Sequence, residues 1–521
     1  MAYINEINNT TQGDSVIFLD INQIQRERII QLEHIRTLGV MGLHQSVLKL
    51  GLPCTTMHWA SYWDTDDAIT YITKWLNSVG GKRPIFGFSN LFGLDIFGDG
   101  APHTDNIVLA KKIKEHFPDS KIIVGGPNPV CITEPHVKLD GLFYGRALWL
   151  MERWLQDKSI PTANQDVNEF GIPIFFNPVA VVPEDPIVPD LHPDYCLSEE
   201  DVLTFETRLG CKFDCTFCGY EFRGNKDPHN ANEDNVLAYL EEAKSYGITR
   251  FSIVDDTFNE DKSKLDLMLN VVRQLDYQPR IAGFNRFDIL VGKRDTIDVL
   301  DEIGFHGHLW GIETFHPEAS KKIKKTARPD KFFKTLELIR DEYPHWWVTG
   351  SMIVGIPPET SEHSIEMAKR YIGDKLFSAI NAHPLFLRKF SEGISDSQAD
   401  FTRNPEKYGL YLTGKEDPND HFSDWASEYG SYKEANTCAD RIQKLAITNG
   451  VTPISPWTAI SKDAIGHKLF SKAGKEQFTK NVIEHNADGF NRQYFTDLFL
   501  QDFKTIIANY VVRKLNYVET L

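Results

Sequence analysis

Two long stretches of this 521-residue chain alternate short apolar runs with segments of helical pattern. The first stretch covers residues 15–155, and the second covers residues 202–390. Strands that alternate with helices of roughly 10–15 residues form βαβ units, and such units build parallel sheets. The pattern therefore predicts an α/β protein with two parallel sheets, whose ligands bind at the carboxyl ends of the strands.

The alternating stretches divide the chain into four predicted segments. Residues 1–156 are expected to form a Rossmann-like parallel sheet, and residues 157–200, which contain seven prolines, a linker. Residues 201–390 hold six strand–helix repeats, which indicates a partial (β/α)6 TIM-type barrel. Residues 391–521 lose the alternation, so we expect a mainly helical C-terminal extension.

The charge balance argues against nucleic acid as a partner. Lys plus Arg is 56 and Asp plus Glu is 73, which gives a net charge of −17, whereas phosphate binding needs a concentrated positive surface. No run approaches 18 apolar residues, so no membrane span is expected, and the polar start is unlike a secretory signal. Seven cysteines are sparse for a disulfide framework, which favours the cytoplasm as the location.

Three of the cysteines lie within eight residues, directly after the predicted strand 202–208. Cys211, Cys215 and Cys218 have the spacing C-x3-C-x2-C. An iron–sulfur cube normally takes four protein thiolates, so three would leave one iron open to a ligand. A structural zinc site, which needs four ligands, and three unliganded buried thiols are the two alternatives.

Four further motifs follow the first cysteine in order. An aromatic residue, Phe217, precedes the third cysteine, and residues 254–258 read VDDTF. Residues 311–314 read GIET, and residues 350–360 read GSMIVGIPPET. Together these motifs resemble the radical S-adenosylmethionine (SAM) superfamily, in the branch that carries an N-terminal cobalamin-binding-like domain.

The resemblance implies a role for the cysteine loop. Cys211, Cys215 and Cys218 would hold a [4Fe–4S] cluster whose open iron is chelated by SAM. An electron from a donor such as flavodoxin or ferredoxin would cleave SAM reductively to a 5′-deoxyadenosyl radical. That radical would abstract hydrogen from an unactivated carbon, while the protein orients the cofactors and excludes water.

Seven residues at or near strand ends are candidates for holding SAM. They are Phe217, Asp255, Asp256, Arg286, Glu313, Gly350 and Gly355. Asp255 or Asp256 would accept a hydrogen bond from the SAM ammonium group. The guanidinium of Arg286 suits a carboxylate, although an ion pair with Asp288 is an equal alternative.

The other candidates carry alternatives of the same kind. Glu313 would bond the SAM ammonium or a ribose hydroxyl, because a buried carboxylate needs a partner. Gly350 and Gly355 fit a strand that a ligand approaches closely, or are ordinary packing glycines. The backbone around Phe217 would meet the adenine, or the loop simply packs there.

The N-terminal segment resembles the cobalamin-binding domain that precedes many radical SAM domains. The order of its elements and the run KIIVGGP at 121–127 carry this resemblance. The D-x-H-x-x-G loop, whose histidine ligates cobalt, is missing, since residues 20–25 read DINQIQ. The usual GEGE after the last strand reads GRAL at 145–148. Bound cobalamin and a cobalamin-free scaffold domain therefore both stay open.

Three other features are weaker signals. His306 and His308 alternate on one predicted strand and can bind a metal, although packing in the core is favoured. His383, near the end of the sixth predicted strand, is expected either to face the substrate or to pack in the protein core. The basic run KKIKK at 321–325 is expected to be a solvated helix face, with an anionic ligand as the alternative.

The sequence therefore predicts a radical SAM enzyme, with cobalamin-dependent methyl transfer as one outcome. The alternatives are a cobalamin-free epimerase or rearrangement enzyme, and a non-catalytic binding protein stabilised by metal. The substrate is unknown, and a small molecule, a peptide or a lipid precursor all fit the acidic composition.

Overall fold

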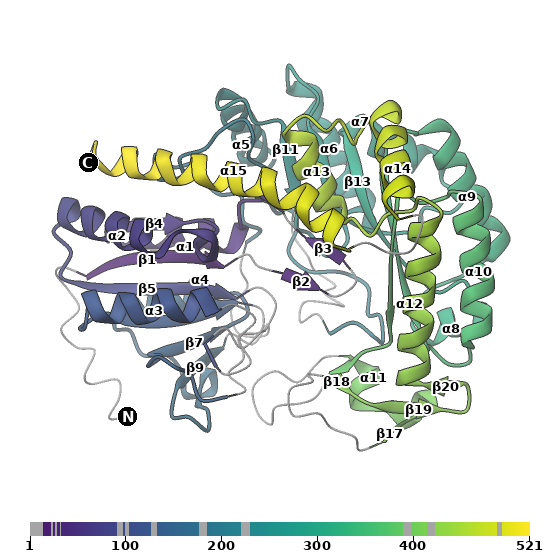
Figure 1. Cartoon of the computed structure of the whole chain (residues 1–521), viewed down its shortest axis with the longest axis horizontal. Coiled ribbons are helices and arrows are strands. Elements are labelled where there is room, and N and C mark those ends of the chain that lie inside the picture. Colours follow the sequence, from purple (N-terminus) through teal and green to yellow (C-terminus); the bar gives the residue numbers. More distant parts are fainter. Residues whose placement is uncertain are drawn as a thin grey trace.

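The computed structural model holds two parallel sheets joined by a long C-terminal helix (Figure 1). The described residues are 14–21, 24–26, 29–31, 33–90, 97–98, 104–126, 133–176, 185–219, 230–388, 399–413, 422–486 and 492–521. Within these ranges, no helix combines the length and the apolar character that crossing a bilayer requires.

The N-terminal sheet has seven strands, and all but one run parallel to their neighbours. Across the sheet they are β4 (Cys54–Met57), β1 (Asp14–Ile21), β5 (Arg83–Asn90), β6 (Lys121–Gly126), β7 (Gly141–Tyr144), β9 (Pro173–Phe176) and β8 (Gln165–Val167). The first five follow the doubly wound order 2-1-3-4-5, which confirms the Rossmann-like expectation.

Helices cover both faces of this sheet (Figure 1). They are α1 (Leu38–Lys49), α2 (Thr65–Val79), α3 (Thr104–His116) and α4 (Leu148–Leu155). Helix α2 begins where the side chain of Asp64 accepts from two backbone N–H groups, and it ends at Gly80 with φ +67°. Its apolar face, with Ile72 and Trp75, is buried in the domain core.

The segment predicted as a linker holds structure that belongs to the first sheet. Strand β9 pairs in parallel with β7, and β8 forms the antiparallel edge beyond it. The N-terminal sheet therefore continues past residue 156. Asp194 and Tyr195, in the 3-10 turn η3 (Pro193–Tyr195), are almost fully buried, so the end of this segment packs into the molecule.

The second sheet has six parallel strands and confirms the partial barrel. In order they are β10 (Leu203–Phe205), β11 (Arg250–Ile253), β12 (Arg280–Arg286), β13 (Phe305–Glu313), β14 (Trp347–Val354) and β15 (Ala379–Pro384). Strands β10 and β15 stand at the two ends of this order, so the sheet does not close on itself.

Helices pack against this curved sheet along its length. They are α5 (Glu233–Ser245), the 3-10 turn η4 (Phe258–Glu260), α6 (Lys262–Gln274), α7 (Arg294–Ile303), α8 (Pro317–Lys322), α9 (Pro329–Glu342) and α10 (Ser361–Gly373). Helix α7 buries Ile297, Leu300 and Ile303, which lie on one face at a spacing of three.

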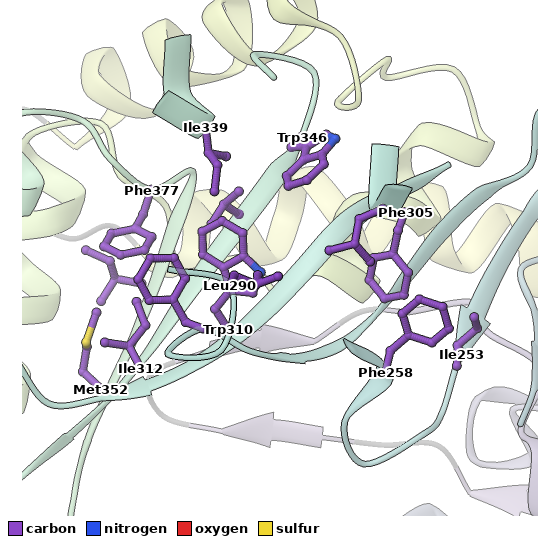
Figure 2. Packing of buried hydrophobic residues seen from close by; sticks show 14 of the residues in the cluster. Ile253, Phe258, Leu290, Phe305, Trp310, Ile312, Ile339, Trp346, Met352 and Phe377 are labelled. Atoms are coloured by element: carbon purple, nitrogen blue, oxygen red, sulfur yellow. The ribbon is translucent and has the colours of Figure 1, made fainter. Parts of the chain in front are cut away.

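The core between these helices and the sheet is rich in aromatic rings. Figure 2 shows Phe258 beside Phe305, whose ring centres are 4.8 Å apart, and it also labels Trp310, whose ring centre is 5.0 Å from that of Phe287. Apolar area removed from water is worth roughly 25 cal/mol per Å². Burial of several such rings therefore fixes the register of the strands whose ends carry the site.

The C-terminal segment is mainly helical, as predicted. Its helices are α11 (Asp400–Arg403), α12 (Tyr432–Thr448), α13 (Pro456–Ala464), α14 (Lys472–His485) and α15 (Arg492–Val518). Among the described residues, four short strands that were not expected accompany them, β17 (Leu410–Leu412), β18 (Phe422–Ser423), β19 (Trp425–Ser427) and β20 (Gly430–Ser431), and β16 (Leu387–Arg388) lies just before the segment.

A buried polar network ties α15 to the N-terminal domain and to the start of the barrel. Lys514 of α15 lies 2.7 Å from the Asp194 carboxylate. The guanidinium of Arg36 pairs with Asp201 through two hydrogen bonds of 2.9 Å and lies 4.5 Å from the ring centre of Tyr510. These contacts hold the two sheets in one arrangement (Figure 1).

Candidate cofactor site

The cysteine loop follows β10 at the carboxyl edge of the barrel sheet. Cys211 and Cys215 are buried, Cys218 is half-buried, and the backbone N–H of Cys218 donates to the Cys215 carbonyl at 3.2 Å. Burial raises the pKa of the Cys211 thiol. A thiol of this kind becomes a thiolate when a metal binds, because the cation compensates the buried charge.

Neighbouring elements hold the loop in place. The Thr216 hydroxyl donates to the carbonyl of Lys322 at 2.7 Å, and the Thr216 carbonyl accepts from the backbone of Phe401 at 3.0 Å. On the other side, the backbone N–H of Lys212 donates to the buried Glu260 carboxylate at 2.9 Å. The loop conformation is therefore fixed by α8, α11 and η4.

A guanidinium and a hydroxyl lie against two of the cysteine sulfurs. Arg286 Nη1 donates to Cys215 Sγ at 3.4 Å, and the hydroxyl of Thr257 lies 3.5 Å from Cys211 Sγ. The guanidinium of Arg286 also pairs with both oxygens of Asp288, at 2.6 and 3.0 Å. The structure thus has the Asp288 ion pair that the sequence analysis kept as an alternative.

Asp255 and Asp256 have different surroundings, although they are neighbours in the chain. The carboxylate of Asp255 is 1% exposed, lies 2.6 Å from Lys264 Nζ and accepts from the backbone of Thr207 at 2.8 Å. These bonds join β10 to the end of β11. Asp256 is half-buried. Asp255 is therefore used in holding two strand ends together.

Glu313 ends β13 in a left-handed conformation, with φ +67°. A register shift between Gly311 and Glu313 precedes it. Its buried carboxylate pairs with Lys325 Nζ at 2.8 Å, and the same Nζ donates to the Gly311 carbonyl at 2.8 Å. Positive φ in a residue other than glycine costs about 1–3 kcal/mol and clusters at ligand sites.

Lys325 is a site residue that the sequence analysis did not identify. The expectation of a solvated face for 321–325 is wrong at this position, because Lys325 is 9% exposed. Its Nζ lies 5.7 Å from the ring centre of Phe217, so Glu313, Lys325 and the cysteine loop meet. The need of a buried Glu313 for a cation was the signal that could have found it.

Gly350 and Gly355 are confined by protein atoms. A Cβ on Gly350 would lie 3.0 Å from atoms of both Met352 and Phe377. At Gly355, where φ is +96°, a Cβ would lie 2.5 Å from the indole of Trp425. These contacts are those of packing glycines, the alternative that the sequence analysis kept.

Glu359 of the run GIPPE links two strand ends. Its carboxylate accepts from the Thr314 hydroxyl, from the Ser364 hydroxyl at 2.9 Å and from His363 Nδ1 at 3.0 Å. The hydrogen bond from His363 to Glu359 raises the pKa of His363. The sequence analysis used Glu359 only as part of a motif, whereas the structure uses it to fasten β13 to α10.

In the N-terminal sheet, polar groups meet where β1 and β5 end. The Ser89 hydroxyl donates to Asp20 Oδ1 at 2.9 Å, and His58 Nδ1 lies 3.2 Å from Asp20 Oδ2. His58 is fully buried, and its Nε2 has no hydrogen-bond partner. This is the switch point of the strand order, where ligands of such sheets bind. Asn22 and Gln23, which stand where the D-x-H-x-x-G loop was sought, lie outside the described residues, whereas residues 145–148 are described.

Comparisons with known proteins agree with this architecture. The model of the radical SAM superfamily matches residues 206–371. TsrM from Kitasatospora setae, a radical S-adenosylmethionine methyltransferase solved with cobalamin and a [4Fe–4S] cluster bound, superposes with a TM-score of 0.58 at 13% identity, covering 91% of this chain and 100% of TsrM. OxsB, a cobalamin-dependent S-adenosylmethionine radical enzyme, gives 0.51 at 12% identity, over 98% of this chain and 80% of OxsB.

Curated sequences are similar over a shorter span. The tRNA-2-methylthio-N(6)-dimethylallyladenosine synthase of Streptomyces avermitilis is 22% identical over 166 residues, which are 30% of this chain and 32% of that protein. The protein of the same name from Cutibacterium acnes is 23% identical over 211 residues, which are 35% of this chain and 41% of that protein. The match thus spans about a third of these relatives.

The family match and the fold lead to the same assignment. The matched residues contain the cysteine loop and four of the six barrel strands, β11 to β14, and the solved structures also cover the domain that precedes them. Residues 206–371 match the radical SAM superfamily, and the chain shares its fold with TsrM and OxsB.

Proposed function

We propose that this protein is a radical SAM enzyme in which Cys211, Cys215 and Cys218 hold a [4Fe–4S] cluster. The observation that carries the proposal is the fixed cysteine loop at the carboxyl edge of the barrel, with a guanidinium on one sulfur. When bound, the cluster and SAM supply an electron transfer that splits the sulfonium and a 5′-deoxyadenosyl radical that abstracts hydrogen from an unactivated carbon.

The residues around the loop fit this cofactor pair. Buried thiols with hydrogen-bond donors on their sulfurs are typical of iron–sulfur ligands, whose potential those donors tune. Asp256 is the carboxylate we propose for the SAM ammonium, because it is half-buried and reachable, whereas Asp255 is 1% exposed. Phe217 lies beside Lys325, at the edge where we propose that the adenine is held.

The charges at the strand ends define what the remaining candidates can do. Arg286 can hold a cofactor carboxylate only if it gives up part of its pairing with Asp288. Its present position instead places a positive charge against the cluster sulfurs. We therefore assign Arg286 to the cluster and leave Glu313, with Lys325 beside it, as the polar pair available to a SAM ammonium or hydroxyl.

We further propose that cobalamin binds at the carboxyl edge of the N-terminal sheet and supplies a methyl group to the carbon that loses hydrogen. The orphaned Nε2 of buried His58 and the polar strand ends of Asp20 and Ser89 support a ligand at this switch point. The substrate would be a small molecule, a peptide or a lipid precursor, with a flavodoxin or ferredoxin as electron donor in the cytoplasm.

Anaerobic reconstitution tests the proposal. The full chain, loaded with iron and sulfide and supplied with SAM and a reductant, is expected to form 5′-deoxyadenosine and methionine. Cys215→Ala should lose the cluster and the product. Cys438→Ala is the matched control, because Cys438 is also buried but bonds to the Ser361 carbonyl on α10. Stoichiometric zinc without SAM cleavage would favour a non-catalytic metal-stabilised protein.

A cobalt count decides the second half of the proposal. The chain is produced with cobalamin supplied, desalted, and analysed for cobalt and for the absorption spectrum of the bound corrinoid. One cobalt per chain would support methyl transfer. A desalted protein that lacks cobalt but still forms deoxyadenosine would be a cobalamin-free epimerase or rearrangement enzyme.

A further inference from the structure

His306 is an extra residue in the pairing of β12 with β13. Ile281 faces Phe305 and Ala282 faces Gly307, so that His306 has no opposite residue on β12. Such a bulge bends the strand and re-aims the side chain of the extra residue. The alternation that placed His306 and His308 on one face is therefore broken between them.

The two histidines consequently have different environments. His308 is fully buried, with its ring centre 4.2 Å from that of Trp346 and 5.4 Å from that of Trp310. The ring of His306 instead lies 4.8 Å from the ring of His345, nearly perpendicular to it. The bulge thus releases His306 from the aromatic core and brings it to a second histidine.

A carboxylate completes this group. Asp301 comes from the last turn of α7, His306 from the start of β13 and His345 from the connection between α9 and β14. One ligand atom of each lies within 4.8 Å of the other two, and His345 Nε2 is 2.7 Å from Asp301 Oδ1. Three consecutive strand–helix units of the barrel therefore meet through ligand-type side chains.

We propose that Asp301, His306 and His345 form a second metal site, for a borderline divalent ion such as Zn²⁺. Two imidazoles and one carboxylate suit this class of ion, with water in the remaining position. Zinc bonds of about 2.0–2.2 Å require the three ligand atoms to draw closer. Side-chain rotation at the partly exposed His345 and Asp301 allows this, since they are 33% and 34% exposed.

The environment of His306 suits a cation. His306 Nδ1 is buried and has no hydrogen-bond partner, and an orphaned buried atom of this kind needs an explanation. Beside it, the Asp301 carboxylate lies 2.7 Å from His345 Nε2 and accepts a hydrogen bond of 2.7 Å from Trp346 Nε1, so it is held in place.

The surroundings already hold the carboxylate and keep the nearest cation in an ion pair. Trp346 Nε1 donates to Asp301 Oδ1 at 2.7 Å, which is the kind of outer contact that orients a metal ligand. Arg280, whose charge acts on His306, is ion-paired with Asp463 of α13. A divalent ion therefore meets a carboxylate and two imidazoles, and the nearby guanidinium is held in an ion pair.

This site is separate from the cysteine loop. The cysteines follow the carboxyl end of β10, whereas His306 is at the amino end of β13 in the same parallel sheet. Figure 1 shows α7 and α14 at one end of the barrel and α8 at the other. A metal here would fasten α7, β13 and β14 beneath α14, whose Lys475 donates to the Trp346 carbonyl at 2.6 Å.

Metal counting on the full chain, with its iron–sulfur cluster reconstituted, tests this site. The protein is incubated with Zn²⁺, desalted, and analysed for zinc and iron, and Co²⁺ is added in parallel as a spectroscopic probe. The wild-type chain is expected to retain one zinc per chain and to show a tetrahedral cobalt spectrum without thiolate bands. His306→Gln should weaken zinc binding by at least about tenfold and leave the iron count unchanged.

His467→Gln is the matched control, because His467 Nε2 also pairs with a carboxylate, that of Asp502 at 3.0 Å, on the C-terminal helices. It should bind zinc as the wild type does. If circular dichroism shows that His306→Gln is misfolded, Asp301→Asn replaces it. Zinc retained equally by both site variants, or by neither the wild type nor the variants, would overturn the proposal.

Discussion

The guanidinium of Arg286 donates a hydrogen bond to the sulfur of Cys215 across 3.4 Å. Arg286 is the last residue of β12, and Cys215 lies in the loop after β10, two strands away in the sheet. The Asp288 ion pair and the aromatic ring of Phe213, 4.0 Å from the guanidinium carbon, hold the donor in position. A permanent positive charge is therefore built against one ligand of the proposed cluster.

Replacing Arg286 by glutamine should make the cluster harder to reduce. The reduced cluster carries one more negative charge, which the nearby guanidinium stabilises. Removing the guanidinium therefore lowers the reduction potential of the cluster. We expect a shift of about 60 mV or more to negative values, which is a tenfold change for one electron. A spectroelectrochemical titration of the reconstituted protein measures it.

Arg280→Gln is the control for this shift. Arg280 begins the same strand at the opposite end, and Asp463 keeps Arg250 as a partner when Arg280 is lost. The control should leave the potential within a few millivolts of the wild type, since a charge well beyond the Debye length of about 10 Å is largely screened. Equal shifts in both variants would contradict the assigned role of Arg286.

Lys325→Met should be far more harmful than Lys321→Met, although both remove a lysine from the same basic run. Lys325 is buried against Glu313, and loss of one partner of a buried ion pair costs about 3–5 kcal/mol. Lys321 is exposed and pairs with Glu318, a contact worth about 0–1 kcal/mol. Thermal unfolding, monitored by circular dichroism, compares them.

A double variant separates the effect of losing the ion pair from the effect of losing packing contacts. Glu313→Gln together with Lys325→Met removes both charges and should recover part of the stability that Lys325→Met loses. Should the double variant be as unstable as the sum of the single ones, the pair would contribute by packing alone. SAM binding by the two single variants and the double variant shows whether the loss of Glu313 weakens SAM binding.

Gly355→Ala should destabilise the fold. A methyl group there would meet the Trp425 indole at 2.5 Å in a backbone conformation with φ +96°. Overpacking of this kind typically costs about 1–3 kcal/mol. Gly373→Ala, at the end of α10, is the control, because nothing lies within 4 Å of its Cβ position. It should raise the melting temperature slightly, because alanine favours helix by about 1 kcal/mol over glycine.

The sequence was sufficient for the architecture because hydrophobic periodicity determines it. Apolar runs such as residues 347–354 are buried along their whole length, as strands of a parallel sheet must be. The cysteine loop was predictable for a related reason: its three ligands lie within eight residues, so no long-range contact is needed to bring them together.

The side-chain partners within the site were not predictable, because they depend on contacts between elements far apart in the chain. Asp255 and Asp256 are equivalent in the sequence, and only the position of Lys264 in α6 shows that Asp255 is held in a buried ion pair. The bulge at His306 cannot be read from an HGH pattern that suits a regular strand. The basic run predicts an exposed Lys325, and only its contact with Glu313 in the structure shows that it is buried.

The pair of Asp194 and Lys514 gives a prediction about pH. Burial alone would raise the pKa of Asp194, but Lys514 and His44 outweigh it and lower that pKa from 3.8 to about 2. A carboxyl whose pKa is lower in the folded state stabilises the fold above its unfolded pKa. That contribution, about 2 kcal/mol, is lost as the pH falls from about 4 towards 2.

Urea unfolding of the wild type and of Asp194→Asn between pH 7 and pH 3 measures this contribution. The variant should be less stable at pH 7, because Lys514 is left buried without its carboxylate. The difference between the two proteins should narrow as the pH approaches 3, since Asp194 of the unfolded wild type then takes up a proton while the folded protein keeps its carboxylate charged. A difference that stays constant over this range would show that Asp194 acts through its hydrogen bonds to Thr55 and Thr56 and not through its charge.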